Sequence, residues 1–391
     1  MNLKNNTNAL KDKSNYDLNR AWLLFKLISN PFISKVLTSL LQLALNLKLP
    51  IKFLVKATIF KQFCGGETIE ESKKTVNKLW SSKIGSILDY SAEGKKNESD
   101  FKNVYEQGIQ ILEESRNNKK IPFVVFKLTG LVPFELLNKK SNNINLNKEE
   151  NLVFTNFQKR LKMICEKARE INTPIFIDAE ESWIQDAIDH IVLDLMKKYN
   201  KEKVLIYNTL QMYRNDRIKY LNFLIDTAKE NRFKIGLKLV RGAYHEKEIE
   251  RAKRKEYDIP VHLDKKLTDN DFNKSLEICI KNLDLISICS GTHNIESSEY
   301  LVKLMNENEI SKDDERIYSS QLFGMSDNIS YNLALNGYNA CKYVPYGPVK
   351  DVIPYLIRRA EENRSIAGQM SRELINIVEE KKRRKNSKIH K

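Results

Sequence analysis

The sequence lacks the features of membrane-spanning, disulfide-bonded and zinc-binding proteins. The longest uncharged apolar stretch, Val36 to Leu47, has only 12 residues, whereas a spanning helix needs roughly 20. The five cysteines are odd in number and show no CxxC spacing, so we expect neither a disulfide framework nor a metal site. Residues 1–20 are polar and rich in Asn and Lys, and we expect no secretory signal in them. These absences predict a protein of the reducing cytoplasm.

Length and hydrophobic content are those of an ordinary globular protein. The chain has 391 residues, 41% of them hydrophobic, which suffices for one large domain with an appendage or for two domains. The net charge is +15, and residues 381–391 contribute seven Lys and Arg, which leaves +8 for the remainder. No aromatic residue interrupts this basic run. We therefore expect a disordered, solvated tail over residues 376–391 and no nucleic-acid partner.

Residues 1–80 are distinguished by aromatic residues and lysines that alternate in helical segments. Such a pattern is typical of helices lying on an anionic membrane, and also of a helical arm packed on a larger domain. We favour the N-terminal helical arm, with peripheral membrane contact as the alternative. The residues that form the pattern are Trp22, Leu23, Phe25, Phe32, Phe53 and Phe60 with Lys26, Lys35, Lys48, Lys52 and Lys56, in segments broken at Pro31 and Pro50.

Beyond about residue 81, short apolar runs alternate with charged segments of helical period. Eight such strand-helix units predict a closed, distorted (βα)8 TIM-like barrel of the α/β class over residues 81–375. No GxGxxG follows any of the strands, so we expect no Rossmann dinucleotide site. The predicted strands are Ile84–Tyr90, Phe123–Thr129, Pro174–Ala179, Val204–Thr209, Ile235–Arg241, Leu283–Cys289, Arg316–Gln321 and Ala340–Pro345.

Polar residues gather at the ends of these strands, where the chemistry of such barrels is placed. Each one alone has a structural explanation, such as a helix cap for Asp178 or a core position for His293. Together, a polar ring around one barrel mouth is costly to bury unless a large polar cofactor satisfies it. The ring comprises Asp89, Lys127, Asp178, Glu180, Gln211, Lys238, Arg241, Thr292, His293, Asn294, Gln321 and Tyr343.

Two adjacent arginines follow the last predicted strand. Tyr355, Arg358, Arg359 and Glu362 stand at i, i+3, i+4 and i+7, so they share one stripe of a helix. Two guanidinium groups side by side can clamp a carboxylate, and the carboxylate of Glu362 can orient one of them. We expect this stripe to line a pocket for a small carboxylate; a solvated helix face is the alternative.

Six segments in chain order resemble the flavin-dependent proline dehydrogenases. They are ILDYSAEG, IDAEES, LKLVRGAY, GTHN, QLFGM and KYVPYGPVKDVIPYLIRRAEEN, and together they span about residues 81–365. The resemblance implies FAD across the carboxyl ends of the barrel strands. It also implies oxidation of L-proline to Δ1-pyrroline-5-carboxylate, with electrons passed to a membrane quinone. The expected location is then the cytoplasm, with peripheral contact at the inner face of the cell membrane.

The resemblance assigns substrate-binding roles to individual residues. Arg358 and Arg359 resemble the pair that binds the proline carboxylate, with Lys127 as a third cation. Asp178 resembles the carboxylate that holds Lys127 and an arginine in place, and Glu362 resembles the one that braces the arginines. The substrate is thus expected to lie among three cations.

The resemblance also implies a ring pocket and a set of flavin contacts. Leu322, Tyr343 and Tyr355 resemble the walls around the pyrrolidine ring, and Tyr343 is expected to close the pocket against a ring hydroxyl. The implied flavin contacts are Gln211, Lys238, Arg241, Gly242, Tyr244, Thr292, His293, Asn294 and Gln321.

Two rival interpretations belong to other functional classes. Lys127 at a strand end near Asp178 is also compatible with a Schiff-base lysine of an aldolase-type lyase without flavin. The basic tail and arm are compatible with a protein that binds nucleic acid or anionic lipid, whose binding would fall steeply with salt.

Overall fold

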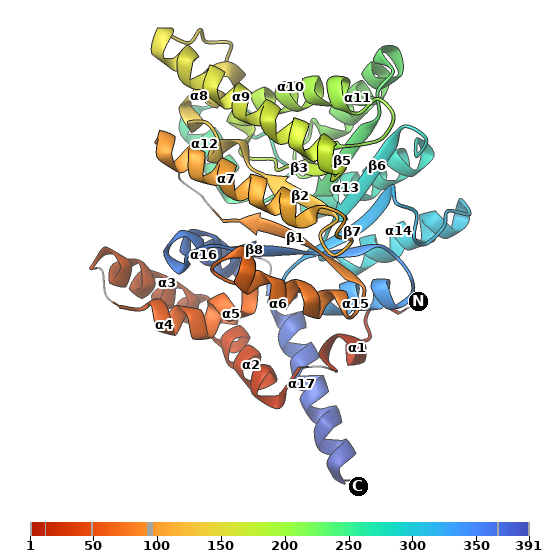
Figure 1. Ribbon diagram of the computed structural model, residues 1–391. Helices are drawn as coiled ribbons and strands as arrows, with labels where there is room; N and C mark the ends of the chain where they lie inside the picture. The colour runs from red at the N-terminus through yellow and green to blue at the C-terminus, as the bar shows by residue number, and fades with distance from the viewer. Residues whose placement is uncertain (1, 12, 48–49, 92–96, 366, 390–391) are drawn as a thin grey trace.

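The computed structural model describes the backbone of residues 2–389 apart from residues 12, 48–49, 92–96 and 366. Side chains are described for the same residues apart from 31, 42–43, 45–46, 361–372 and 387–389. Figure 1 shows a barrel at the top, a helical arm below it, and the last helix extending away from both.

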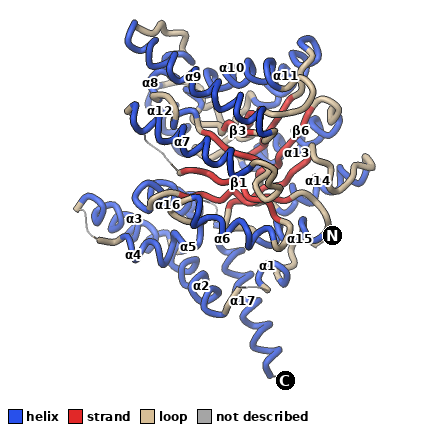
Figure 2. Tube along the Cα trace, in the orientation of Figure 1, coloured by secondary structure: helices blue, strands red, loops and turns tan. Residues whose placement is uncertain are grey.

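Eight parallel strands form a closed barrel in chain order, and β1 pairs with β8 to complete it (Figures 1 and 2). This confirms the (βα)8 fold, and every predicted strand overlaps an observed one. Helices cover the outside and side chains fill the inside, so these strands read as apolar runs. The strands are β1 (Ile84–Tyr90), β2 (Phe123–Phe126), β3 (Ile175–Ile177), β4 (Ile206–Gln211), β5 (Ile235–Val240), β6 (Ile286–Gly291), β7 (Ile317–Leu322) and β8 (Ala340–Tyr346).

The outer layer consists of amphipathic helices that bury one face against the strands. In α9, for example, Phe157, Leu161, Ile164 and Ala168 are buried at helical spacing, and Asn147 and Glu150 cap its start reciprocally. The helices are α7 (Glu98–Ser115), α8 (Phe134–Ser141), α9 (Lys148–Ile171), α10 (Ser182–Tyr199), α11 (Arg217–Asn231), α12 (His245–Lys255), α13 (Lys265–Lys281), α14 (Ile295–Glu307), α15 (Asp327–Leu335) and α16 (Val349–Ser365).

Aromatic side chains fill the barrel interior beneath its mouth. The rings of Phe123 and Phe176 stack with centroids 4.4 Å apart, and Tyr207 meets the edge of Phe176 at 5.1 Å. The ammonium of Lys238 lies 5.7 Å from the centroid of the Phe176 ring. The apolar plug therefore ends directly below the polar residues at the carboxyl ends of the strands.

The N-terminal arm is helical and packs on the C-terminal helices. Helix α2 contacts the last helix, α17 (Ala367–Ile389), and α3 contacts both α2 and α16. Their contact is a second core, which includes Leu18, Phe25, Phe63, Leu356 and Ile377. The arm comprises α1 (Thr7–Leu10), α2 (Asn15–Ser29), α3 (Pro31–Asn46), α4 (Lys52–Val55), the π-helix η1 (Lys56–Phe60), α5 (Lys61–Phe63) and α6 (Ile69–Trp80).

The basic tail differs from its prediction, because α17 (Ala367–Ile389) is a helix where we expected disorder. Glu380 pairs with Arg383 and Arg384 at i+3 and i+4, a spacing that supports a helix. Arg384 also donates to the Leu10 carbonyl at 2.8 Å. The charges of the tail are thus partly used in folding it onto the arm.

Among the described residues, no single helix has the length and apolar composition of a membrane span. One pair, Asn15–Ser29 with Phe32–Leu41, meets that test only jointly and across a bend of 101°.

Candidate active site

A cavity of about 580 Å³ opens at the carboxyl ends of the strands, a size typical of ligand and cofactor sites. Sixteen of the predicted site residues line it; the side chain of the remaining one, Glu362, lies outside the described residues. The sixteen are Lys127, Asp178, Gln211, Lys238, Arg241, Gly242, Tyr244, Thr292, His293, Asn294, Gln321, Leu322, Tyr343, Tyr355, Arg358 and Arg359. The structure thus gathers them in one place, as strand ends and a following helix predict.

Positive charge predominates in the cavity wall. Among the described lining residues, six are Lys or Arg and two, Asp89 and Asp178, are carboxylates. Such an excess favours an anionic ligand, because clustered positive groups create a positive potential in the cavity. The six cationic residues are Lys127, Lys238, Arg241, Lys265, Arg358 and Arg359.

Asp178, Lys238 and Tyr343 form a hydrogen-bonded triangle at the cavity floor. The Lys238 ammonium contacts a carboxylate oxygen of Asp178 and donates to the Tyr343 hydroxyl at 2.7 Å. Tyr343 in turn donates to the same Asp178 oxygen at 3.0 Å. Burial and the charge of Asp178 raise the pKa of Tyr343 well above its usual value, so the phenol keeps its proton.

The triangle gives Asp178 two partners on other strands. The structure joins it to Lys238 and Tyr343, and the role toward Lys127 and an arginine that the resemblance implies stays a prediction. The side chains of Lys238 and Tyr343 project into the mouth from β5 and β8, and Asp178 follows β3 directly. Three strand ends that are distant in sequence therefore converge on one carboxylate.

Arg241 is held by neighbouring side chains along its whole guanidinium. It donates to Asp269 at 2.7 Å, to the Thr292 hydroxyl at 2.5 Å and to the Ser297 hydroxyl at 2.9 Å. Thr292 also accepts the backbone N–H of Asn294 at 3.1 Å. Burial lowers the pKa of Arg241 despite the neighbouring carboxylate. Arg241 therefore orders the turn from β6 into α14 as well as lining the cavity.

Two glutamines tie together the loops around the mouth. Gln211 donates to the Glu180 carbonyl at 2.7 Å and accepts the Ala243 N–H at 3.1 Å. Gln321 donates to the Thr292 carbonyl at 3.1 Å and accepts from the Ser330 hydroxyl at 2.6 Å. Both amides thus have a scaffolding role in addition to lining the cavity.

Position 242 requires glycine because of its backbone conformation and its contact with a neighbouring aromatic ring. Its φ is +136°, which side chains rarely adopt. A Cβ there would lie 2.5 Å from ring carbons of Tyr213. Tyr244, two residues later, ends the turn at the start of α12, and burial raises the pKa of its hydroxyl.

His293 joins two parts of the cavity wall. Its Nδ1 lies 3.0 Å from the Ser326 hydroxyl, and its Nε2 lies 3.5 Å from the Leu322 backbone nitrogen. Leu322 at the end of β7 and Met325 in the loop after it both line the cavity. The imidazole thus anchors that loop to the end of β6.

Helix α16 presents the predicted stripe to the cavity. Tyr355, Arg358 and Arg359 all line it, which confirms that they share one face. The Arg359 guanidinium lies 5.2 Å from the centroid of the Tyr355 ring, a cation–π distance that orients it. The arrangement has two planar cations and an aromatic wall on one side, with Lys127 and the Asp178 triangle belonging to the same cavity.

Sequence reasoning missed several lining residues. Lys265 begins α13 after an irregular segment, so no strand-end pattern points to it. Met325 lies in the loop after β7, where its apolar side chain suggests packing. Thr209 and Ser320 have inward positions on β4 and β7 that the strand period could have indicated.

One carboxyl group beside the cavity has an unusual proton affinity. Glu180 is buried. Its carboxylate accepts hydrogen bonds from the Thr129 backbone N–H at 3.1 Å and from the Thr129 hydroxyl at 2.5 Å. Burial raises its pKa to about 7. Among the described residues, no group of His, Cys, Asp and Glu is placed to hold a metal ion.

Comparisons with known proteins agree in the family that they indicate. A family profile described as proline dehydrogenase matches residues 72–372. The chain is 33% identical over 418 residues to proline dehydrogenase 1, mitochondrial, of Dictyostelium discoideum, covering 95% of this chain and 73% of that protein. It is 29% identical over 416 residues to the hydroxyproline dehydrogenase of Xenopus laevis, covering 96% of this chain and 89% of that protein.

Solved structures show the same fold. Proline utilization A from Bdellovibrio bacteriovorus, inactivated by N-propargylglycine, superposes with a TM-score of 0.70 at 18% identity. The match covers 78% of this chain and 32% of that one, so this chain spans about a third of the larger protein.

Proposed function

The chain belongs to the proline dehydrogenase family, and from this we propose that it oxidises L-proline to Δ1-pyrroline-5-carboxylate with FAD as cofactor. The observation that carries the proposal is the single cavity in which a carboxylate clamp meets a ring of polar strand ends. A carboxylate and a flat, polyanionic cofactor are the two ligands that such a wall suits.

The cavity suits FAD in charge and is larger than a small amino acid alone requires. Its basic lining residues outnumber the acidic ones, which suits a diphosphate. A volume of about 580 Å³ leaves room for more than one small amino acid. When bound, FAD would supply the hydride acceptor for the oxidation. The residues proposed to hold it are Gln211, Lys238, Arg241, Gly242, Tyr244, Thr292, His293, Asn294 and Gln321.

In this proposal, the substrate is bound by residues of α16 and of the triangle formed by Asp178, Lys238 and Tyr343. Arg358 and Arg359 would grip the carboxylate bidentately, and Lys127 would add a third positive charge. Tyr343, Tyr355 and Leu322 would enclose the ring. Loss of hydride from the carbon next to nitrogen requires a neutral amine. Three cations near the substrate disfavour an ammonium, so they help to release that proton to solvent.

A product assay tests this substrate assignment. Purified enzyme with FAD and an artificial electron acceptor is given L-proline, D-proline or trans-4-hydroxy-L-proline, and the pyrroline product is trapped as a coloured adduct. We expect adduct from L-proline and far less from the D-isomer, whose ring and carboxylate cannot both reach their walls. Turnover of hydroxyproline alone would keep the family and overturn the assignment of proline.

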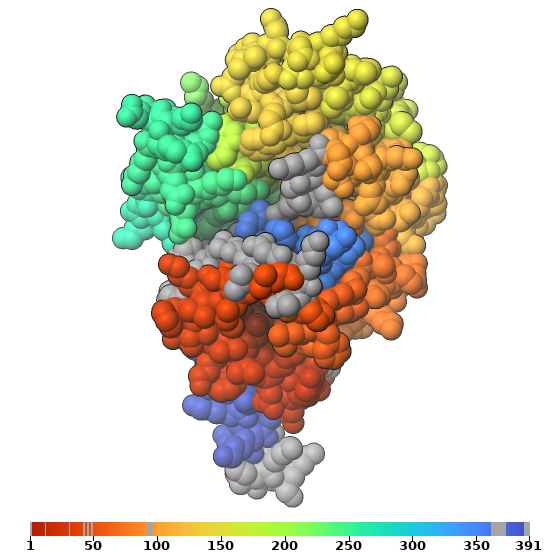
Figure 3. Space-filling view, turned by 90° about the vertical axis from the view of Figure 1, so that its left-hand side faces the viewer, coloured from red at the N-terminus to blue at the C-terminus, as the bar shows by residue number. Residues whose placement is uncertain are grey.

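We further propose that the electrons pass to a membrane quinone and that the arm docks on an anionic bilayer at the inner, reducing face of the cell membrane. Apolar side chains on α3, α4 and the segment between them are unusually exposed, with Phe32 at 78%, Phe53 at 84% and Leu54 at 65%. Lys35 and Lys52 are exposed beside them, so the face combines apolar and positive groups. Figure 3 shows the arm in red and orange below the barrel.

Vesicle sedimentation tests the docking surface. Each phenyl ring that enters the bilayer contributes about 1.5 kcal/mol or more, so Phe32→Ser/Phe53→Ser should weaken binding to phosphatidylglycerol vesicles at least tenfold. Leu152→Ser is the matched control, because Leu152 is 64% exposed on α9, away from the arm. Equal binding of all three proteins, or none by the wild type, would contradict docking through this face.

A further inference from the structure

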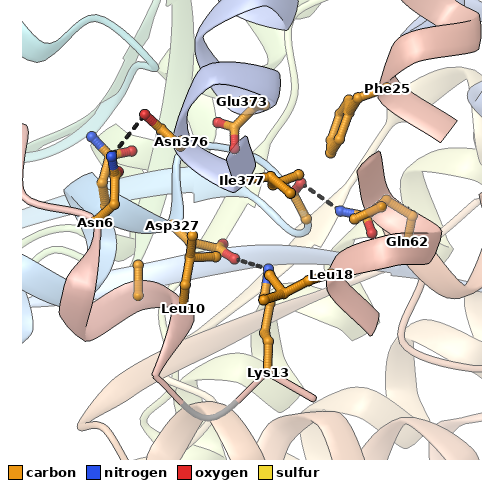
Figure 4. A pocket seen from close by; sticks show the side chains of 14 residues that line it. Asn6, Leu10, Lys13, Leu18, Phe25, Gln62, Asp327, Glu373, Asn376 and Ile377 are labelled. Carbon is orange, nitrogen blue, oxygen red and sulfur yellow. Dashed lines mark hydrogen bonds and ion pairs between the residues drawn. The ribbon is translucent and has the colours of Figure 1, made fainter. Parts of the chain in front are cut away.

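Four charged side chains meet where both ends of the chain contact the barrel. Lys13 pairs with Asp327 at 2.7 Å, and Lys342 pairs with the other oxygen of Asp327 at 3.0 Å. Glu373, on α17, lines a small cavity that Lys13 and Asp327 also line (Figure 4). Burial alone would raise the pKa of Asp327, yet the two lysines hold it well below its usual range. The cluster has two positive and two negative charges, so it is balanced internally.

Balanced buried charges of this kind are weak evidence for a contribution to stability. An apolar cluster of similar volume is often as stable, because desolvation offsets much of the attraction between the charges. The side chain of Lys342 is 0% exposed, which makes its desolvation complete. The position of the cluster is therefore more informative than its energy.

Lys342 and Glu373 of this cluster, together with Gln62 of the arm, hold one loop from outside the barrel. The loop comprises residues 323–326 between β7 and α15. Lys342 donates to the Met325 carbonyl at 2.5 Å, and Gln62 of the arm donates to the Gly324 carbonyl at 2.9 Å. Glu373 accepts the Ser326 backbone N–H at 2.6 Å. The loop is thus held by β8, by the arm and by the last helix together.

The loop needs this restraint because its backbone is strained. Ser326 has a φ of 48° and Gly324 a φ of 79°, both in the left-handed region. A non-glycine residue there costs of order 1 kcal/mol or more and persists where its surroundings hold it. The bond from Ser326 N–H to Glu373 lies at the strained residue itself.

The inner side of the same loop forms part of the cavity wall. Met325 of the loop lines the cavity beside Leu322, the last residue of β7, and the Ser326 hydroxyl lies 3.0 Å from Nδ1 of His293, which also lines it. A direct path of contacts therefore runs from Glu373 through Ser326 to His293. A shift of the loop would move one wall of the cavity.

We propose that Glu373 is a positioning residue for the active site, which sets the β7–α15 loop and, through Ser326, the imidazole of His293. This inference rests on the proposed function, since it assigns the cavity to L-proline and FAD. The proposal gives α17, the helix that follows the arginine stripe of α16, a role in positioning the active site. The small cavity beside Glu373 belongs to this contact between the chain ends.

Three variants test the proposal in the full-length holoenzyme. Glu373→Ala removes the acceptor for the Ser326 N–H, Glu373→Gln keeps an acceptor oxygen, and Ser326→Gly removes the hydroxyl that meets His293 while permitting the left-handed backbone. Glu379→Ala is the matched control, because Glu379 is an exposed acid on the same helix whose contact with Asn6 is long, at 3.5 Å.

Two readouts separate positioning from general destabilisation. We expect kcat/KM for L-proline to fall at least tenfold in Glu373→Ala and in Ser326→Gly, and to return within threefold of wild type in Glu373→Gln. Hydrogen exchange should speed up selectively in peptides covering residues 322–330 of Glu373→Ala. The Glu379→Ala control should change neither quantity.

Three results would overturn the inference. They are an unchanged kcat/KM in Glu373→Ala, faster exchange spread evenly over the barrel, or a Glu373→Gln variant as impaired as the alanine. If Glu373→Ala does not fold, Ser326→Gly decides, and wild-type kcat/KM in that variant overturns the path to His293. An inactive wild-type enzyme would instead contradict the proposed function, while the exchange measurement would still test the restraint on the loop.

Discussion

Removing the charge of Asp178 should destabilise the protein through Lys238. The two side chains are 13% and 6% exposed, so Asp178→Asn leaves a buried ammonium without its anionic partner. Breaking a buried ion pair in this way costs about 3–5 kcal/mol. The asparagine can still accept from Lys238 and Tyr343, and the pair borders a cavity that admits water. We therefore expect a loss at the lower end, about 3 kcal/mol.

A double-mutant cycle measures this coupling. Asp178→Asn, Lys238→Met and the double variant are unfolded in urea under identical cofactor conditions, with fluorescence and circular dichroism as two probes of one transition. The double variant removes both charges, so it should be more stable than Asp178→Asn, with a coupling energy of about 2 kcal/mol. A loss below about 0.5 kcal/mol in Asp178→Asn, or strict additivity in the cycle, would refute the reasoning.

Three further predictions concern the clamp, the ring pocket and a titrating group. Arg359→Met should raise KM for L-proline roughly 10- to 100-fold, because a charge-assisted hydrogen bond contributes about 1.5–3 kcal/mol, and should leave the FAD content unchanged; an unchanged KM would remove Arg359 from the clamp. Tyr343→Ser should raise the ratio of kcat/KM for trans-4-hydroxy-L-proline to kcat/KM for L-proline, because Tyr343 is proposed to close the ring pocket against a hydroxyl. A constant ratio would show that Tyr343 does not contact the pyrrolidine ring. Glu180 has a usual pKa of 4.5 that burial raises to about 7, so the folded state binds the extra proton and stability should fall by up to about 3 kcal/mol as pH rises through that window. Glu180→Gln should flatten this part of the curve in urea titrations from pH 4.5 to 7.5, and an unaltered slope would contradict the shift.

The sequence sufficed for the barrel and for most of the cavity wall, for identifiable physical reasons. Strands such as Ile84–Tyr90 are buried on both faces, so they are continuous apolar runs in the sequence. Their polar ends must converge, because the carboxyl ends of parallel strands share one edge. The stripe of Tyr355, Arg358 and Arg359 followed from helical period alone.

Other features depend on tertiary contacts that leave no periodic signal. The partner of Asp178 is Lys238, 60 residues later, and only the closed barrel brings them together. Gln62 meets Gly324 across 262 positions. The tail was expected to be disordered from its charge, whereas Glu380 and the contact of Arg384 with the arm fold it into α17.

The most direct test of the proposed function is the visible spectrum of the purified protein before and after L-proline is added without air. We expect flavin absorption bands that bleach on addition of L-proline, because the cavity would then hold both the cofactor and a substrate that reduces it. Flavin bands that persist with L-proline would contradict the substrate assignment. A colourless protein that cannot be reconstituted with FAD would contradict the cofactor assignment and favour a Schiff-base lysine at Lys127.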